Sequence, residues 1–421
     1  MFTGLRYQAL PVWSSLSSWP AHWERCRLKD VAQINRSSLP EDTDPDFTFR
    51  YIDIGCVDRL GRILETEEMT FADAPSRARR IVAEGDSIVS MVRTYLRAIA
   101  QVPTPANDLI VSTGFATITA KRGMHPRFLY WWLRSKAFVD EVVARSIGVS
   151  YPAVNGSDIA DIAAPVPPCE EQERIAHYLD AETARIDELI VEQEAIAALA
   201  EERHRALVLE TLATTAHDVS AAVALKRAVK SIQTGGTPPT VRPEYFEEGT
   251  VPWYSPSSVD RHLSLGQPVK LLSKEAIDDG EAPLIPAKAT MMVTIGATIG
   301  RVAQLLEPGS CNQQMTAVVP GDGVDARFLA WTLWALGHRV AAIAPNTTLP
   351  IFTQAALGRE TVWMPTGSEQ RRIADVLDES EAHLMALLEE VENQGRLLRE
   401  HRQALITAAV TGGLEALGRA A

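Results

Sequence analysis

Two stretches of the chain share a helical pattern of apolar positions. The first runs from about residue 170 to 213, with some 40 residues that contain no glycine or proline and many strong helix formers. Its apolar residues recur at spacings of three and four, which predicts a long helix with a narrow apolar seam. Shifted by 198 residues, the stretch superposes on residues 369–409, where the apolar positions form a regular heptad. Two such helices predict a coiled coil.

The predicted seam runs through both helices. Two unrelated surface helices are the alternative, but a shared register at a fixed offset disfavours them. Gln193 interrupts the first seam, where it either fixes the register as a buried polar residue or faces solvent. The predicted seam residues are Leu179, Ile186, Leu189, Ile196 and Leu207 in the first helix, and Leu377, Leu384, Leu387, Val391, Leu398 and Leu405 in the second.

The segments before the two helices also repeat. LKDVAQI (28–34) matches LKRAVKSI (225–232), and RFLYWWL (127–133) matches RFLAWTL (327–333). In the first half, runs of β-branched and aromatic residues at 49–58, 86–92 and 109–120 predict strands, and the pattern of residues 127–147 predicts a helix. The fold class is therefore α+β, with two duplicated α/β domains and two long coiled-coil helices. The predicted parts are a flexible arm (1–18), a first domain (19–168), a central helix (169–216), a second domain (217–366), a C-terminal helix (367–411) and a tail (412–421).

Length and composition narrow the class of protein. The 421 residues suffice for two or three domains. No apolar run reaches the ~18 residues of a membrane span, and the first residues lack the pattern of a signal peptide. The four cysteines form no CxxC pair or zinc pattern. These features predict a reduced, cytoplasmic protein with no metal and no membrane contact.

The negative charge is concentrated in the two helices. Of a formal net charge of −13, nearly all comes from residues 170–216 and 368–411, which together hold 21 acidic and nine basic residues. The remainder of the chain is close to neutral, so nucleic acid remains a possible partner of the globular parts. The acidic helices fit protein-docking surfaces, or equally well simple solvated faces.

Motifs of catalysis are absent from the sequence. There is no phosphate-binding loop, because the turn at Gly235–Pro239 lacks the required lysine. There is likewise no dinucleotide fingerprint, no amino-methylating motif, no GxSxG elbow and no HExxH helix. We find no catalytic centre, and we expect a binding protein.

Two matched loops carry side chains suited to reading DNA bases. Arginine pairs with guanine, and glutamine or asparagine pairs with adenine in the major groove, whereas basic residues elsewhere could hold phosphates. For each residue, an ordinary ion pair or loop bond is the competing interpretation. The base-reading candidates are Arg93, Tyr95, Arg97, Ser112 and Thr113 in the first half, and Arg301, Asn312, Gln313 and Gln314 in the second. The phosphate candidates are Arg77, Arg79, Arg80, Lys121, Arg122 and Lys288.

The duplicated plan resembles the specificity subunit of type I restriction–modification systems. The resemblance rests on WPAHWERCRLKDVA near the start, on NQQMTAVV in the second half, and on a Pro-rich approach to a Glu-Gln-x-x-Ile-x-x-x-Leu motif. That motif occurs twice, at Glu171–Leu179 and Glu369–Leu377, and the likeness covers roughly residues 19–415. The first half departs from the pattern, since STGFATI replaces the amide-rich form.

The resemblance implies a DNA reader in a phage-defence complex. Each globular part would be a target recognition domain for one half of a bipartite double-stranded DNA target. The two long helices would form an antiparallel coiled coil that joins and separates the two domains, spaces the halves of the target and docks two methyltransferase subunits. Adenine-N6 methylation with S-adenosylmethionine would belong to those partners. An ATP- and Mg-dependent restriction endonuclease subunit can join them. The chain itself would bind no cofactor and supply no catalytic residue. A non-DNA scaffold that joins two protein-binding domains is the alternative.

Overall fold

The computed structural model describes residues 19–103, 105–106, 108–148, 151–214, 221–260, 262–343 and 350–413. The predicted arm and residues 414–421 of the predicted tail lie outside this range. The chain forms two compact units, one made of residues 1–193 and 393–421 and the other of residues 194–392. Each unit therefore contains one globular part together with segments of both long helices.

The first unit contains two four-stranded sheets. Their strand orders are β2-β9-β6-β7 and β4-β3-β8-β5, and β3 and β8 run parallel while the other neighbours are antiparallel. The predicted strand pair at 109–120 contributes to both sheets, because a turn at Thr113–Gly114 separates β8 from β9. A small sheet of β1 and β10 completes the part. The bounds are β1 Glu24–Arg27, β2 Ala32–Ile34, β3 Thr48–Ile52, β4 Glu67–Thr70, β5 Ala78–Ile81, β6 Ser87–Ser90, β7 Ile99–Gln101, β8 Leu109–Ser112, β9 Phe115–Ala120 and β10 Ala163–Val166.

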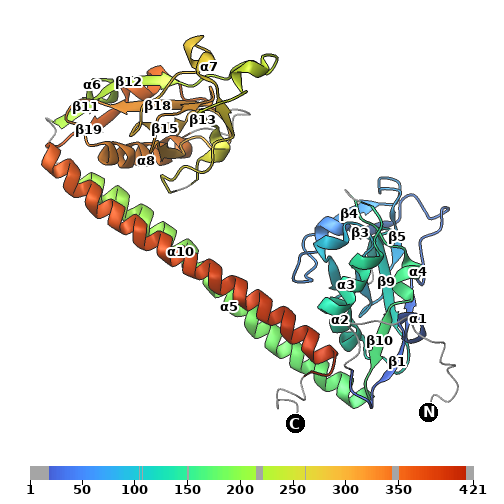
Figure 1. Ribbon diagram of the computed structural model, residues 1–421. Helices are drawn as coiled ribbons and strands as arrows, with labels where there is room; N and C mark the ends of the chain where they lie inside the picture. The colour runs from blue at the N-terminus through green and yellow to red at the C-terminus, as the bar shows by residue number, and fades with distance from the viewer. Residues whose placement is uncertain are drawn as a thin grey trace. The chain divides into compact units, whose positions relative to one another are not determined.

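Short helices cover the first of these sheets. The helix predicted over 127–147 is two helices, because Ser135 ends α2 and caps α3 by accepting a hydrogen bond from Phe138 N at 3.2 Å. α2 contacts β6, β7 and β9, and it lies beside β9 in Figure 1. Its two tryptophans, Trp131 and Trp132, are buried. The bounds are α1 Leu28–Val31, α2 Pro126–Arg134, α3 Lys136–Arg145 and α4 Gly156–Ala160.

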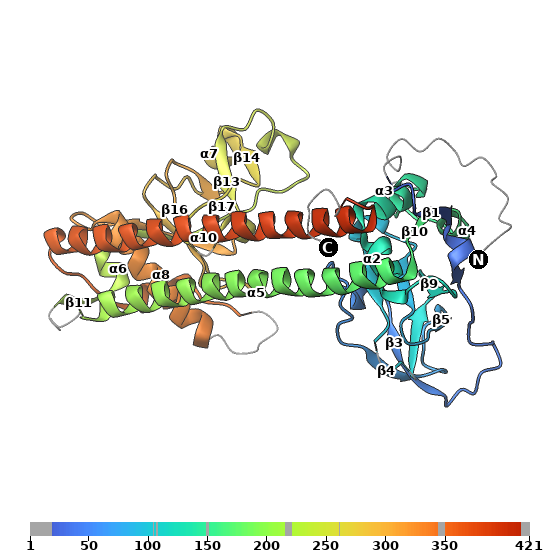
Figure 2. The same ribbon diagram turned by 90° about the horizontal axis from the view of Figure 1, so that it is seen from below.

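The second unit repeats this arrangement. Its sheets are β12-β18-β15-β16 and β14-β13-β17, with β11 and β19 forming the small third sheet. α8 packs against β15 and β16 (Figure 1), and α7 lies beside β13 and β14 (Figure 2). The strands are β11 Ala222–Ala224, β12 Val229–Thr234, β13 Val251–Tyr254, β14 Lys270–Leu272, β15 Thr290–Val293, β16 Val302–Gln304, β17 Ser310–Cys311, β18 Met315–Pro320 and β19 Thr361–Trp363. The helices are α6 Leu225–Ala228, α7 Lys274–Asp278, α8 Ala326–Ile343 and α9 Gln354–Arg359.

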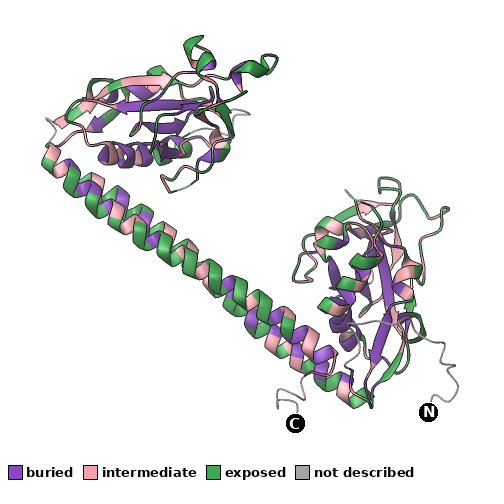
Figure 3. Cartoon of the chain, in the orientation of Figure 1, coloured by how far each residue is buried: buried purple, intermediate pink, exposed green. Residues whose placement is uncertain are grey.

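The two long helices are α5 (Cys169–Thr214) and α10 (Gly367–Val410). They pack in opposite directions, since in the second unit Val208 lies in one cluster with Ile373 and Leu377, while the preceding turn of α5 meets Glu381. Buried residues lie mainly toward the two ends of each helix, and half-buried residues continue the stripe between them (Figure 3). A stripe of this width is typical of a helix pair with one shared seam.

Four of the predicted seam residues are wrong by one position. Leu189, Ile196, Leu207 and Leu387 are exposed, at 41%, 45%, 39% and 41%. The next residue is the more buried one in each case: Ile190, Ala197, Val208 and Leu388. Apolar residues are adjacent at these points, so the sequence pattern does not distinguish the two phases. The positions Leu179, Ile186, Leu377, Leu384 and Leu405 are buried, and Val391 and Leu398 are half-buried.

A buried glutamine joins each globular part to its long helix. Gln172 accepts a hydrogen bond from His125 N at 2.7 Å, and its amide donates to Pro167 O at 2.8 Å and to Gly123 O at 3.0 Å. In the second unit, Gln370 accepts from Asp325 N and donates to Pro365 O, each at 2.8 Å. The glutamine of the repeated Glu-Gln motif therefore serves structure, by satisfying backbone groups where the helix begins.

An aspartate two turns later makes a second, equally repeated attachment. Asp180 accepts hydrogen bonds from Arg127 at 2.6 Å and from the Trp131 indole at 2.8 Å. In the second unit, Asp378 accepts from Arg327 and from the Trp331 indole, both at 2.8 Å. The sequence repeat therefore places the same side-chain hydrogen bonds at equivalent positions in both units. It orients α2 and α8 on their helices in the same way.

Candidate nucleic-acid interface

The loop between β6 and β7 carries three base-reading candidates. A single 3-10 turn, Thr94–Leu96, forms the loop, and Arg93 and Arg97 flank it in left-handed conformations, with φ of 50° and 54°. This conformation costs a non-glycine residue about 1 kcal/mol or more. Arg93, Arg97 and Tyr95 are exposed. Backbone strain at an exposed polar loop is typical of a functional site.

The equivalent loop of the second unit has glycines at the two left-handed positions. Gly296 and Gly300 have φ of 104° and 89°, and they correspond to Arg93 and Arg97 at an offset of 203 residues. Glycine adopts this conformation without steric cost. The two halves therefore share one backbone shape, but only the first half places cations on it.

Equivalent backbone hydrogen bonds join three chain segments in each unit, and we call this bonded arrangement the frame. In the first unit, they run from Met91 N to Gly114 O, from Arg93 N to Pro152 O and from Val154 N to Met91 O, each 2.8 Å long. In the second unit, they run from Thr294 N to Gln314 O at 2.9 Å, from Gly296 N to Pro350 O at 3.1 Å and from Phe352 N to Thr294 O at 2.8 Å. The structure thus brings together the two sequence-predicted segments in each half, and it adds a third segment that sequence reasoning missed.

The two base-reading candidates after β8, Ser112 and Thr113, differ in burial and in hydrogen bonding. Ser112 is 2% exposed, and its hydroxyl accepts a hydrogen bond from Gly114 N at 3.2 Å. This placement argues against the prediction that Ser112 reads a base, since its polar group is used inside the turn. Thr113 is half-buried, and its N–H donates to Arg77 O at 2.7 Å. The turn therefore supports the neighbouring loop more than it presents groups of its own.

In the second unit, the amide residues bond mainly to one another. Asn312 is buried and donates from Nδ2 to the Gln314 side chain at 3.1 Å, while its side-chain oxygen Oδ1 accepts from Gln314 N at 3.1 Å. Gln313 is exposed and accepts from the Thr237 hydroxyl. Arg301 donates to Val259 O at 3.3 Å, and it lines a cavity instead of joining the amides. Gln313 is the amide best placed to meet a ligand.

The six phosphate candidates fall into two groups. Arg79 and Arg80 are half-buried: Arg79 lies 4.3 Å over the Phe71 ring, and Arg80 donates to Ser38 at 3.2 Å. Their surroundings argue for structural roles. The others are exposed, although Arg77 pairs with Asp53 at 3.5 Å and Lys121 donates to Lys29 O. The exposed candidates are Arg77, Lys121, Arg122 and Lys288.

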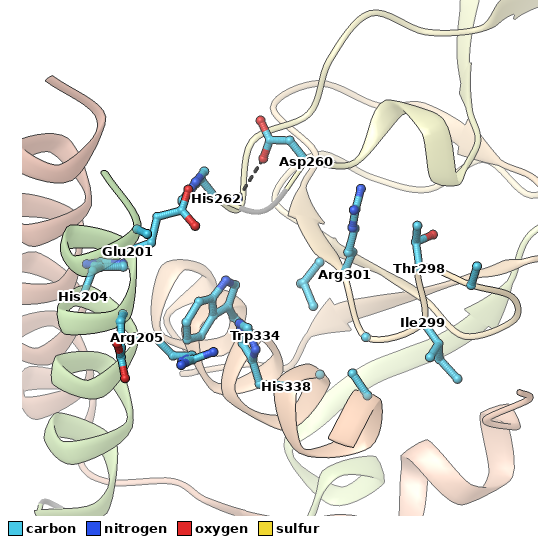
Figure 4. A pocket seen from close by; sticks show the side chains of 17 residues that line it. Glu201, His204, Arg205, Asp260, His262, Thr298, Ile299, Arg301, Trp334 and His338 are labelled. Atoms are coloured by element: carbon cyan, nitrogen blue, oxygen red, sulfur yellow. Dashed lines mark hydrogen bonds between the residues drawn. The ribbon is translucent and has the colours of Figure 1, made fainter. Parts of the chain in front are cut away.

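A second buried polar cluster links the long helices to the globular part of the second unit. It borders a cavity of about 540 Å³ that α5, α8 and the loop bearing His262 enclose (Figure 4). Glu381 of α10 lies 2.7 Å from His204 Nε2 on α5 and 3.5 Å from His262 Nδ1. The equivalent place in the first unit holds a pair of Arg402 with Asp187 at 2.8 Å. Among the residues that the structure describes, the second unit alone has histidines in this contact.

The charges around this cluster set its pH dependence. The adjacent Glu381 carboxylate raises the pKa of His262 above its usual range, against a smaller effect of burial, and Asp260 and Glu201 add to the rise. Burial opposes ionisation of Glu381, but the His204 and His262 imidazoles outweigh it and lower the pKa of Glu381 to about 2. Elsewhere in the cavity, burial and then Arg205 lower the pKa of His338.

We expect the second unit to lose stability as the pH rises above neutrality. His262 has a raised folded pKa, so its contribution is complete below about pH 6.5 and is lost as the pH passes its folded pKa. The loss is on the order of 1 kcal/mol. Urea unfolding at pH 6 and pH 9 measures it. His262→Asn removes the dependence, and an unchanged slope in this variant would contradict the assignment.

Within the part of the chain that the structure describes, none of the helices combines the length and hydropathy needed to cross a bilayer. In the same part, no group of three or more histidine, cysteine, aspartate or glutamate side chains is placed to hold a metal ion.

The duplicated sequence matches a known protein family. A family profile described as "Type I restriction modification DNA specificity domain" matches residues 20–193 and again residues 228–394. The chain belongs to this family. The predicted family membership is confirmed, and so is the predicted fold of two duplicated domains with two long antiparallel helices.

Individual members of the type I specificity family agree with this. The chain is 27% identical over 149 residues to the "Type I restriction enzyme EcoR124I/EcoR124II specificity subunit" of Escherichia coli, a match covering 34% of this chain and 37% of that subunit. The matched segment thus spans little more than a third of this relative. A solved structure of a type I R-M system superposes with a TM-score of 0.75 at 25% identity, over 93% of this chain and 98% of that one. The HsdS subunit of Thermoanaerobacter tengcongensis gives 0.53 at 25% identity, over 94% and 98%.

Proposed function

We propose that the chain is the DNA-reading specificity subunit of a cytoplasmic type I restriction–modification complex. One observation carries the proposal: two globular parts share a bond-for-bond frame but present different exposed side chains on it. Arg93, Tyr95 and Arg97 in the first half stand where the second has Gly296, Thr298 and Gly300. A constant frame with variable exposed residues suits the reading of two different half-sites.

In this proposal, the chain contributes recognition and its partners contribute the chemistry. Adenine-N6 methylation belongs to methyltransferase subunits that bind S-adenosylmethionine. DNA cleavage belongs to a restriction subunit that uses ATP and Mg. The side chains of the interface are arginines, amides and tyrosines, which donate hydrogen bonds and stack. Such groups select a sequence without transferring a group to it.

The long helices supply matched surfaces for two methyltransferase subunits. In the second unit, α5 and α10 form a groove of about 750 Å³ whose walls include Leu199 and Leu387. These leucines are 67% and 41% exposed. The equivalent residues of the first unit, Leu397 and Leu189, are 55% and 41% exposed. Exposed apolar surface rimmed by acids is typical of a protein interface, and its duplication fits two copies of one partner.

The isolated chain is expected to bind DNA weakly, because its globular parts are close to neutral and phosphate neutralisation supplies much of the affinity of DNA-binding proteins. We expect dissociation constants in the micromolar range or weaker for the chain alone, and ~10⁻⁸ M or tighter with the methyltransferase. Filter binding at moderate salt measures both, once methylome sequencing has identified the motif that disappears on deletion of the gene.

DNA with one half-site scrambled serves as the control for sequence specificity. Nanomolar binding by the isolated chain would refute the dependence on a partner. A methylome that is unchanged by the deletion would refute the proposed function itself, and it would favour the scaffold.

A further inference from the structure

The third segment of the first-unit frame carries exposed apolar side chains that the sequence did not single out. We propose that Tyr151 and Ile147, together with Arg93, form the element that reads the first half of the DNA target. This inference rests on the proposed function and deepens it. It moves the reading of that half away from Ser112. It assigns Tyr151 and Ile147 to contacts with base edges.

The exposure of these residues is not explained by folding. Ile147 is 81% exposed and Tyr151 is 67% exposed. Tyr95, on the adjacent loop, is 55% exposed. Apolar side chains left in water contribute little to stability, and their gathering at one place marks a contact surface.

Hydrogen bonds hold the described residues of this segment in place. Ile147 and Ala153 exchange two backbone hydrogen bonds, of 2.8 and 3.0 Å. Arg93 N donates to Pro152 O at 2.8 Å, and the Thr94 and Ser146 hydroxyls lie 2.9 Å apart. These bonds tie the segment to the strained arginine loop from both sides. Tyr151 and Ile147 are therefore presented on a fixed support, which lowers the entropy lost on binding.

The chemistry of the cluster favours DNA over a protein partner. The Arg93 guanidinium lies 5.0 Å from the centre of the Tyr151 ring, so one group offers donors beside an aromatic surface. No ion pair to an acid is found for Arg93 or Arg97 among the described residues. An arginine with free donors can bond to the O6 and N7 acceptors of guanine, and neighbouring apolar groups can contact a thymine methyl. We assign these two kinds of contact to Arg93 and to the Tyr151–Ile147 pair.

The test uses the full chain in complex with its methyltransferase. Competition binding is measured for Tyr151→Ala and Tyr151→Phe against DNAs that each carry one substituted base pair. Tyr151→Ala is expected to reduce discrimination about tenfold at one or two positions of one half-site, and to leave the other half-site unchanged. Tyr151→Phe keeps the ring and is expected to keep the discrimination.

Phe47→Ala provides the matched control, because Phe47 is an exposed aromatic residue of the same unit, 40% exposed. It is expected to change no position of the target. Unchanged discrimination by Tyr151→Ala would overturn the inference while the wild-type complex still reads its bipartite target. An equal loss of affinity for every DNA would also overturn it, since that result indicates a role in assembly. If the wild-type complex prefers no sequence, the proposed function has failed.

Discussion

Replacing Gln172 by alanine is expected to lower the free energy of unfolding of the first unit by about 3 kcal/mol. The Gln172 side chain is fully buried and makes three hydrogen bonds to backbone groups where the globular part meets α5. Alanine leaves the His125 N–H and the Pro167 carbonyl without partners, and it leaves the Gly123 carbonyl with only the Cys169 thiol at 4.0 Å. A buried polar group that loses its partner costs about 1–3 kcal/mol, and relaxation offsets part of the sum.

Urea unfolding followed by tryptophan fluorescence measures this effect, because Trp131 and Trp132 lie in the core that Gln172 supports. Gln193→Ala is the matched control. Gln193 is on the same helix but half-buried, and its replacement is expected to change the free energy of unfolding by less than ~0.5 kcal/mol. If the two variants had equal stability, Gln172 would not be an anchor.

Leu199→Asp is expected to weaken binding of one methyltransferase subunit by two to three orders of magnitude. Leu199 is an exposed wall of the groove between α5 and α10. A charge there would be buried without a partner in the complex, which costs several kcal/mol. The fold is expected to tolerate the change, because the side chain is already in water.

Sedimentation of the chain titrated with the methyltransferase measures the stoichiometry directly. We expect two bound subunits for the wild type and one for Leu199→Asp. Leu306→Asp is the control, since it makes the same chemical change in the same unit at a residue that is 87% exposed outside the groove. Retention of both subunits by Leu199→Asp would place the docking surface elsewhere.

The sequence was sufficient to predict the elements whose signal is periodic and long. The two helices and the repeat followed from spacing alone, and runs of β-branched and aromatic residues completed the α+β class. The antiparallel packing of the helices came only from the resemblance to a known family. The phase of the seam did not, because Leu189, Ile190 and Val191 are all apolar and only packing selects Ile190. Antiparallel contacts such as Asp187 with Arg402 join residues 215 positions apart, which no local pattern encodes.

The candidate site was predicted only in part, for a similar reason. Arginines and amides in matched loops could be identified from the alignment of the two halves. Tyr151 could not be identified in this way, because it joins the candidate site only through the hydrogen bond from Arg93 N to Pro152 O, which links distant parts of the chain. One signal was available: Pro152 and Pro350 recur at the same offset as the repeated helices, 198 residues. A proline kept in both copies of a loop indicates a fixed backbone position.

The backbone bonds of the two frames have a consequence for mutational tolerance. The bonds that hold the loops join N–H and carbonyl groups, as from Met91 to Gly114 and from Thr294 to Gln314. Main-chain groups are the same whatever side chain a residue carries, apart from proline. Residues such as Tyr95 can therefore change identity without loosening the scaffold that supports them. A lineage of such chains can acquire new binding preferences through single substitutions, and each intermediate remains folded.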